Sequence, residues 1–207
     1  MADRSILFSG PMVRALLDGR KTQTRRMLDL GCDEPPAFVR DGIVTAYDEH
    51  GAPYRWPRTH AIGDRLYVRE AWRADSRLDE CRPSLIADCE PVLYEEDGSV
   101  RPTKWTMREA GRYRHGRYMP RWASRLTLTV TDVRVQRVQE ISRGDAMDEG
   151  CEFPNMADGP NPCDWFRDLW NSLNEKRGFG WEANPWVVAL TFTVHRCNID
   201  QMESDHA

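Results

Sequence analysis

Apolar positions near the N-terminus follow first a strand pattern and then a helical one. The run at 6–8 has strand character, and four apolar residues at helical spacing follow Pro11, which is tolerated as a first helical residue. Gly19 is placed to end that helix. Residues 22–27 contain two β-branched threonines and favour a strand. The pattern therefore places Lys21 at a corner between a helix and a strand.

Later apolar patterns predict further strands and a short helix. Leu66 and Val68 alternate with polar neighbours, which is typical of a half-buried strand. Apolar residues also alternate over 125–138, but the phase slips near Asp132, as it does at a bulge or at a corner of a barrel. Ser142 precedes a short helix predicted over 143–149, which Gly150 ends. The last predicted element is an apolar strand over 185–194.

The remaining segments are predicted to be loops and insertions. Residues 30–60 are rich in Gly, Pro and acids, and we expect a loop there with a hairpin inside it. We expect an α+β fold, a small β-barrel flanked by short helices, in a single domain over 1–197. Insertions are expected at about 75–118 and 151–184, and a polar, frayed tail at 198–207.

Composition and charge limit the classes of function. The chain has 207 residues, of which 40% are hydrophobic and 30% charged, as in a globular protein with a core. A net charge of −4 excludes a global basic field, although cations gather at 20–26 and 112–125. No apolar run is long enough for a membrane helix or a signal peptide, so we expect a cytoplasmic protein with no membrane partner.

Cysteine and histidine spacing gives no local sign of a metal site. The six cysteines form no CxxC pair, and the five histidines form no HxxxH pair. Reduced thiols are the expected state inside a cell. We therefore expect neither a metal nor a cofactor.

The sequence around Lys21 resembles the ASCH domain of the PUA-like β-barrel superfamily. The family pattern Gly-x-Lys-x-x-Thr-x-Arg is matched in full by Gly19, Lys21, Thr24 and Arg26. Gly63-Asp64 before a strand fits the same family, and the run 119–125 resembles larger ASCH proteins, many of them from phages and prophages. The resemblance implies a barrel that binds RNA or nucleosides.

At the motif, the chain is similar to one ASCH subgroup, the small N4-acetylcytidine amidohydrolases. These enzymes hydrolyse the amide on the exocyclic nitrogen of acylated cytidine. The resemblance implies a catalytic triad of Lys21, Thr24 and Glu149, with Asp148 and Glu152 as neighbours that could replace Glu149. The chain is longer than those enzymes, and its insertions would reshape the pocket.

These three residue types suit amide hydrolysis. A threonine hydroxyl is a weak nucleophile, and a lysine can accept its proton only when the amine is partly neutral. Burial and neighbouring cations lower a lysine pKa, and Arg20, Arg25 and Arg26 are such neighbours. Glu149 would activate water or protonate the leaving amine. A direct attack by water, with Thr24 only orienting the substrate, also remains open.

A second group of residues points to binding. Basic and aromatic residues interleave over 113–122, as in surfaces that stack bases and hold phosphates. The alternative is that Tyr118 and Trp122 cover one end of the barrel. The alternative function is a non-catalytic module that binds RNA, single-stranded nucleic acid or a modified base. The expected substrate-binding residues are Arg26, Tyr67, Glu70, Trp72, Arg121 and Trp122.

Overall fold

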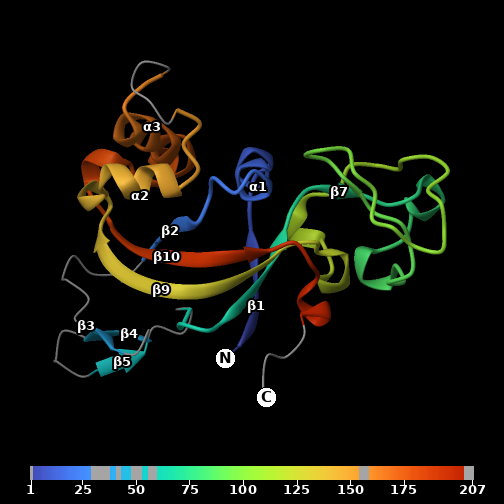
Figure 1. The fold of residues 1–207 in the computed structure, drawn as a ribbon, viewed down its shortest axis with the longest axis horizontal. Helices are drawn as coiled ribbons and strands as arrows, with labels where there is room; N and C mark the ends of the chain where they lie inside the picture. The colour runs from blue at the N-terminus through green and yellow to red at the C-terminus, as the bar shows by residue number, and fades with distance from the viewer. Residues whose placement is uncertain are drawn as a thin grey trace. The chain divides into compact units, whose positions relative to one another are not determined.

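The fold is α+β, with a mixed five-stranded sheet and few helices (Figure 1). The computed structural model describes residues 2–28, 38–40, 43–47, 53–55, 60–153 and 159–202. The five strands lie in the order β1 (Asp3–Leu7), β6 (Arg65–Arg69), β9 (Thr127–Arg137), β10 (Trp186–His195) and β2 (Gln23–Met27). β1 pairs with β6 in parallel, whereas the pairs β6–β9 and β10–β2 are antiparallel.

Two smaller sheets and three α-helices complete the fold. The helices are α1 (Gly10–Leu17), α2 (Arg143–Asp148) and α3 (Pro162–Asn174), and none of the described helices has the length and apolar character needed to span a bilayer. β7 (Trp72–Arg73) pairs with β8 (Leu93–Tyr94). The hairpin predicted within 30–60 is present as a three-stranded antiparallel sheet of β3 (Phe38–Arg40), β4 (Ile43–Tyr47) and β5 (Pro53–Arg55).

The chain forms two compact units. Unit 1 contains Asp18–Asp64 and Val130–Thr193, and unit 2 contains Ala2–Leu17, Arg65–Thr129 and Val194–Ala207. Two of the strands, β9 and β10, contribute residues to both units. The segment 19–26 and the short helix α2 therefore belong to the same unit.

Unit 1 is built on α2 and α3, which lie side by side (Figure 1). The Ser142 hydroxyl accepts the Asp145 N–H and caps α2, as the sequence predicted. Asn161 caps α3 in the same way. The apolar faces of both helices enter one cluster with Val187 of β10 and with two residues from the connection between β9 and α2, because burial of that face stabilises helices this short. The cluster contains Val138, Ile141, Ala146, Phe166, Trp170 and Val187.

Unit 2 has its own buried cluster, to which the predicted insertion 75–118 contributes three of seven residues. The alternation of β6 is confirmed, since Leu66 and Val68 are buried and their neighbours are half-buried. The segment after β7 is mostly loops and short 3-10 helices, yet it supplies part of an apolar cluster. This cluster contains Trp72, Ala74, Ile86, Val92, Tyr94, Met119 and Ala123.

Of two further sequence predictions, the phase slip in β9 is confirmed and the frayed C-terminal tail is not. The phase slip in β9 is confirmed, because burial steps from Leu128 and Val130 to Val133. The frayed tail is wrong at its start, where Asn198 and Ile199 are buried. The Asn198 amide donates to the Arg121 and Ser124 carbonyls, a set of bonds that composition alone does not reveal.

Substitution of two glycines by alanine tests the backbone conformation at two positions. Gly19 has a φ of 74° and no heavy atom within 4 Å of an added Cβ, so Gly19→Ala carries only the left-handed backbone cost of about 1–2 kcal/mol. Gly144 lies in α2 and an added Cβ meets only the Ser142 hydroxyl at 3.8 Å, so Gly144→Ala should stabilise by about 0.4–1 kcal/mol. Urea unfolding measures both, and equal effects would contradict this assignment.

Candidate active site

Lys21 lies where the chain turns from α1 into β2 and meets the end of α2. It forms an isolated antiparallel bridge with Glu149, and the Thr22 N–H donates to the Asp148 carbonyl at 2.8 Å. Glu149 is the C-terminal cap of α2, and Gly150 follows with a φ of 103°. The corner and the short helix are thus joined through backbone as well as side-chain contacts.

The Lys21 and Glu149 side chains form a buried ion pair. Lys21 Nζ lies 2.7 Å from Glu149 Oε2 and also donates to the Glu149 carbonyl oxygen at 2.9 Å. Both side chains are almost wholly removed from solvent. Burying a charge is costly unless it is paired and hydrogen-bonded, and here each partner meets that need for the other.

Arg25 holds the second oxygen of the same carboxylate. Its Nη1 donates to Glu149 Oε1 at 3.1 Å and to Gln23 Oε1 at 3.3 Å, and its Nη2 lies 3.3 Å from Asp145 Oδ2. The guanidinium also lies 5.7 Å from the centroid of the Phe166 ring. Each oxygen of Glu149 is therefore bound by a different cation, which fixes the plane of the carboxylate.

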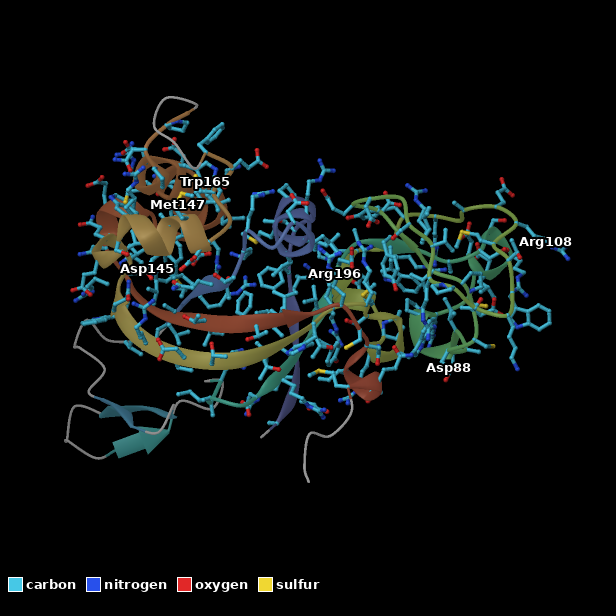
Figure 2. All side chains as sticks on the ribbon, in the orientation of Figure 1. Asp88, Arg108, Asp145, Met147, Trp165 and Arg196 are labelled. Atoms are coloured by element: carbon cyan, nitrogen blue, oxygen red, sulfur yellow. The ribbon has the colours of Figure 1, made fainter. Side chains whose placement is uncertain are left out.

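A wider set of charges surrounds this pair. Gln23 donates to Asp148 at 3.3 Å, and Arg134 donates to Asp145 at 2.8 Å (Figure 2 labels Asp145 on α2). Burial alone would raise the pKa of Asp145, but hydrogen bonds from Arg134, Ser142 and Gln23 and the charge of Arg25 bring it well below its usual value. In the described part of the chain, no three His, Cys, Asp or Glu side chains are grouped to hold a metal ion.

Sequence reasoning missed most of this outer set. Asp145, Asp148 and Glu149 have the i, i+3, i+4 spacing of one helix face, and Gln23 and Arg25 share a face of β2. Matching these two faces would have found the network. The prediction instead treated Arg25 only as a nearby cation.

The environment of Lys21 favours its neutral form more than water does. Burial lowers the pKa of Lys21, and the charges of Arg26 and Arg25 lower it further, while Glu149 partly opposes the change. The predicted contributions of Arg25 and Arg26 are therefore present. Arg20 instead donates to Asp18 and to the Gly150 carbonyl.

Thr24 is buried in β2, where it is paired with Leu190 of β10. Successive side chains of a strand point to opposite faces, so Thr24 and Arg26 share the face opposite Gln23 and Arg25. Burial lowers the pKa of the half-buried Arg26. Lys21 precedes the strand, and the alternation does not fix its direction.

The other expected binding residues lie in unit 2 and have partners there. The Tyr67 ring has the Arg69 and Arg121 guanidinium groups 5.4 and 5.8 Å from its centroid. Arg121 is itself paired with Asp3 at 2.7 Å. Glu70 is buried and accepts two hydrogen bonds from Arg125 at 2.9 and 2.8 Å.

The two tryptophans expected to line a pocket are part of the apolar cluster of unit 2. Trp72 has no exposed surface and carries the Arg114 guanidinium 5.5 Å from its ring. Trp122 is half-buried against the same cluster, with Arg101 5.2 Å from its ring. These contacts show how the two side chains support the fold of unit 2.

Comparisons with known proteins give little similarity. No protein-family model and no curated protein matches the chain. A crystal structure of protein EF3133 from Enterococcus faecalis V583, with the family model DUF984, matches with a TM-score of 0.44 and 11% identity. That match covers 96% of this chain and 83% of the other. The assignment of the site therefore depends on its own residues.

Breaking the buried pair should be costly, because it leaves an uncompensated buried charge. Glu149→Ala should lower the free energy of unfolding by about 3–5 kcal/mol in urea titrations. The matched control is Glu152→Ala, since Glu152 is three residues away, its side chain is 61% exposed and its contact to Arg20 is 3.8 Å, so about 0.5 kcal/mol or less is expected.

The double variant Lys21→Met/Glu149→Ala tests the cause of that loss. Removing the unpaired ammonium should restore part of the stability lost in Glu149→Ala. Equal losses in Glu149→Ala and Glu152→Ala would contradict the buried pair.

Proposed function

We propose that this protein is an amidohydrolase that removes the acyl group from N4 of acylated cytidine, cytosine or a related modified nucleoside. One observation supports this most: a fully buried Lys21 lies 2.7 Å from Glu149, 128 positions later in the chain. These are the two positions that the ASCH resemblance gives for the lysine and the glutamate. Buried ionisable residues with a shifted pKa, such as Lys21, occur preferentially at functional sites.

The proposal includes a PUA-like barrel around this pair. The mixed sheet and short helices of the observed α+β fold are compatible with such a barrel, and the acylated base would enter beside Lys21. No metal or cofactor is needed for the proposed route, because the residues at the site supply a base, a nucleophile and a cation.

In the first half-reaction, the neutral amine of Lys21 accepts the proton of the Thr24 hydroxyl. The Thr24 oxygen attacks the carbonyl carbon of the amide, and an electron pair moves onto the carbonyl oxygen. Arg26 shares a strand face with Thr24, and its guanidinium is the proposed partner of that oxyanion. The carbon–nitrogen bond then breaks, and the exocyclic nitrogen takes the proton from Lys21 to become the amino group of cytidine.

In the second half-reaction, water hydrolyses the ester left on Thr24. Glu149 accepts a proton from the attacking water, the bond to Thr24 breaks, and the Thr24 oxygen recovers a proton. The acyl group leaves as a carboxylic acid. A shorter route has water attack the amide directly, with Thr24 orienting the substrate, and it uses the same Lys21–Glu149 pair. The two routes differ in the formation of an ester on Thr24.

Substitutions in the motif test the proposed reaction. In variants that remain folded, Lys21→Ala, Thr24→Ala and Glu149→Gln should each lower kcat/KM for N4-acetylcytidine by roughly 10²–10⁴, as expected for loss of a proton-transfer or nucleophilic group. Thr22→Ala is the matched control, because Thr22 lies in the same motif without an assigned role, and it should keep near-normal activity. Chromatography of released cytidine measures the rate.

Three outcomes separate the alternatives. Full activity in Thr24→Ala removes the threonine nucleophile and leaves the direct-water route. A folded protein that turns over no member of an acyl-nucleoside panel refutes the hydrolase. Salt-dependent RNA binding by such an inactive protein, lost in Lys21→Ala, would replace it with the non-catalytic module.

The lowered pKa of Lys21 predicts a pH dependence. The fraction of neutral amine rises with pH, so kcat/KM should rise through a pKa below the usual 10.5 of lysine. Arg25→Met removes a neighbouring cation and frees Glu149 to act on Lys21, so the rising limb should move to higher pH. Arg20→Met should leave the limb in place, and an unmoved limb in Arg25→Met would contradict the electrostatic account.

A further inference from the structure

The segment 101–125 of unit 2 concentrates positive charge. It contains eight cationic side chains and one acid, Glu109, in a chain whose net charge is −4. A basic segment is usually a solvated or internally paired part of the fold. The contacts of each cation decide which of these cations are free to bind something else.

Four of the eight cations are bound within unit 2. Arg114 is buried and donates to the Leu78 carbonyl at 2.8 Å. Arg125 bonds Glu70, and Arg121 bonds Asp3, as described above. Arg101 donates to the Asp88 carbonyl at 2.5 Å and lies over the ring of Trp122. These four cations stabilise unit 2, and their side chains are already bound to partners within it.

The other four cations are exposed, and within the described part of the chain their side chains enter no ion pair or hydrogen bond. They are Lys104, Arg108, Arg112 and Arg117. Arg108 lies at the outer edge of the loops of unit 2, directed away from the ribbon (Figure 2). The eight cations of the segment 101–125 therefore divide into four whose side chains are bound within unit 2 and four exposed ones whose side chains are not.

The aromatic side chains of the same segment are also exposed. Trp105, Tyr113 and Tyr118 have exposed fractions of 59%, 55% and 59%. Among Phe, Tyr and Trp residues whose burial the structure describes, these three fall in the exposed class. Large aromatic rings gain more from burial than any other side chain, so their gathering in one basic segment calls for a ligand.

The backbone of this segment is held in place. The Arg108 N–H donates to Asp75 at 2.9 Å, the Ser76 N–H donates to the Glu109 carbonyl at 2.9 Å, and the Arg112 N–H donates to Asp79 at 2.8 Å. An added Cβ on Gly111 would lie 2.3 Å from Asp79 Oδ1, which shows how closely the two segments approach. The outward side chains thus extend from a fixed support.

We infer that residues 104–118 form a binding surface for single-stranded polynucleotide. The three exposed aromatic rings stack on unpaired bases, and the four unpaired cations contact the phosphates. Stacking requires bases that are not already stacked in a duplex, and the interleaved cations follow a charged backbone. The surface lies in unit 2, whereas Lys21 and Glu149 lie in unit 1, so this inference does not depend on the proposed reaction.

Fluorescence anisotropy with the full chain tests the surface. The probes are labelled single strands of about 15 nucleotides, as RNA and as DNA, together with the matching duplex. We expect the single strands to bind more tightly than the duplex, and each aromatic substitution to weaken single-strand binding by roughly 5- to 150-fold. The variants are Trp105→Ala, Tyr113→Ala and Tyr118→Ala. Tighter binding of RNA than DNA, or the reverse, identifies the source of the strand.

The charge contribution is measured through salt dependence. Changing all four unpaired cations to Gln should reduce the slope of log K against log salt by about 3, since each phosphate contact on a single strand contributes about 0.7. The control, Arg143→Gln/Lys176→Gln, removes half as many exposed cations, both from unit 1, and should leave binding and slope nearly unchanged.

Heparin separates base stacking from simple charge attraction, because it is a polyanion without bases. The aromatic variants should bind heparin as the unaltered chain does. Equal losses for heparin and for single strands, or no loss in the aromatic variants, would overturn the stacking surface. Absence of single-strand binding at micromolar protein and low salt would also overturn it. Loss of amidohydrolase activity alone would leave it unaffected.

Discussion

The buried pair of Lys21 and Glu149 is the constraint on which unit 1 depends. It joins the corner before β2 to the end of α2, across 128 positions of sequence. A buried ion pair is weak evidence for stability, because desolvation can cancel the attraction between the charges. Removing one partner is nevertheless strongly destabilising, since it leaves a single buried charge without a counter-ion. The pair therefore selects one arrangement of corner and helix, and Ser142 and Gly150 set the limits of that helix.

The surroundings of the pair oppose each other in a way that suits proton transfer. Burial and, to a smaller extent, the charges of Arg26 and Arg25 favour a neutral amine on Lys21 and lower its pKa, whereas Glu149 favours an ammonium. Because Arg25 also binds the second oxygen of Glu149, it reduces the negative charge that Lys21 experiences. The net result is a lowered pKa of Lys21, which raises the fraction of neutral amine that the proposed reaction needs.

The sequence predicted local elements and missed long-range partners. The corner at Lys21, the cap at Ser142 and the phase slip in β9 follow from propensities and periods that act over a few residues. The contact between Glu149 and Lys21 was expected only from the resemblance at the motif, since no sequence period links positions so far apart. The roles of Arg25 and Asp145 were not predicted, because they depend on the contact between β2 and α2 in the folded chain. Asn198 was taken for a frayed tail because its hydrogen-bond partners are carbonyls near Arg121, which composition cannot reveal.

The same criterion, whether a charge has a partner, distinguishes structure from function in both units. In unit 1 the informative cation is one whose burial and partner shift its protonation. In unit 2 it is the cation whose side chain enters no ion pair or hydrogen bond among the described residues, as for Arg108 and Arg112, whereas the side chains of Arg114 and Arg125 are bound within the unit. Counting charges along the segment treats these as equal. Their contacts show that half of them are bound within the unit, and the rest, in the same segment as three exposed rings, are the cations that we infer to contact a polynucleotide.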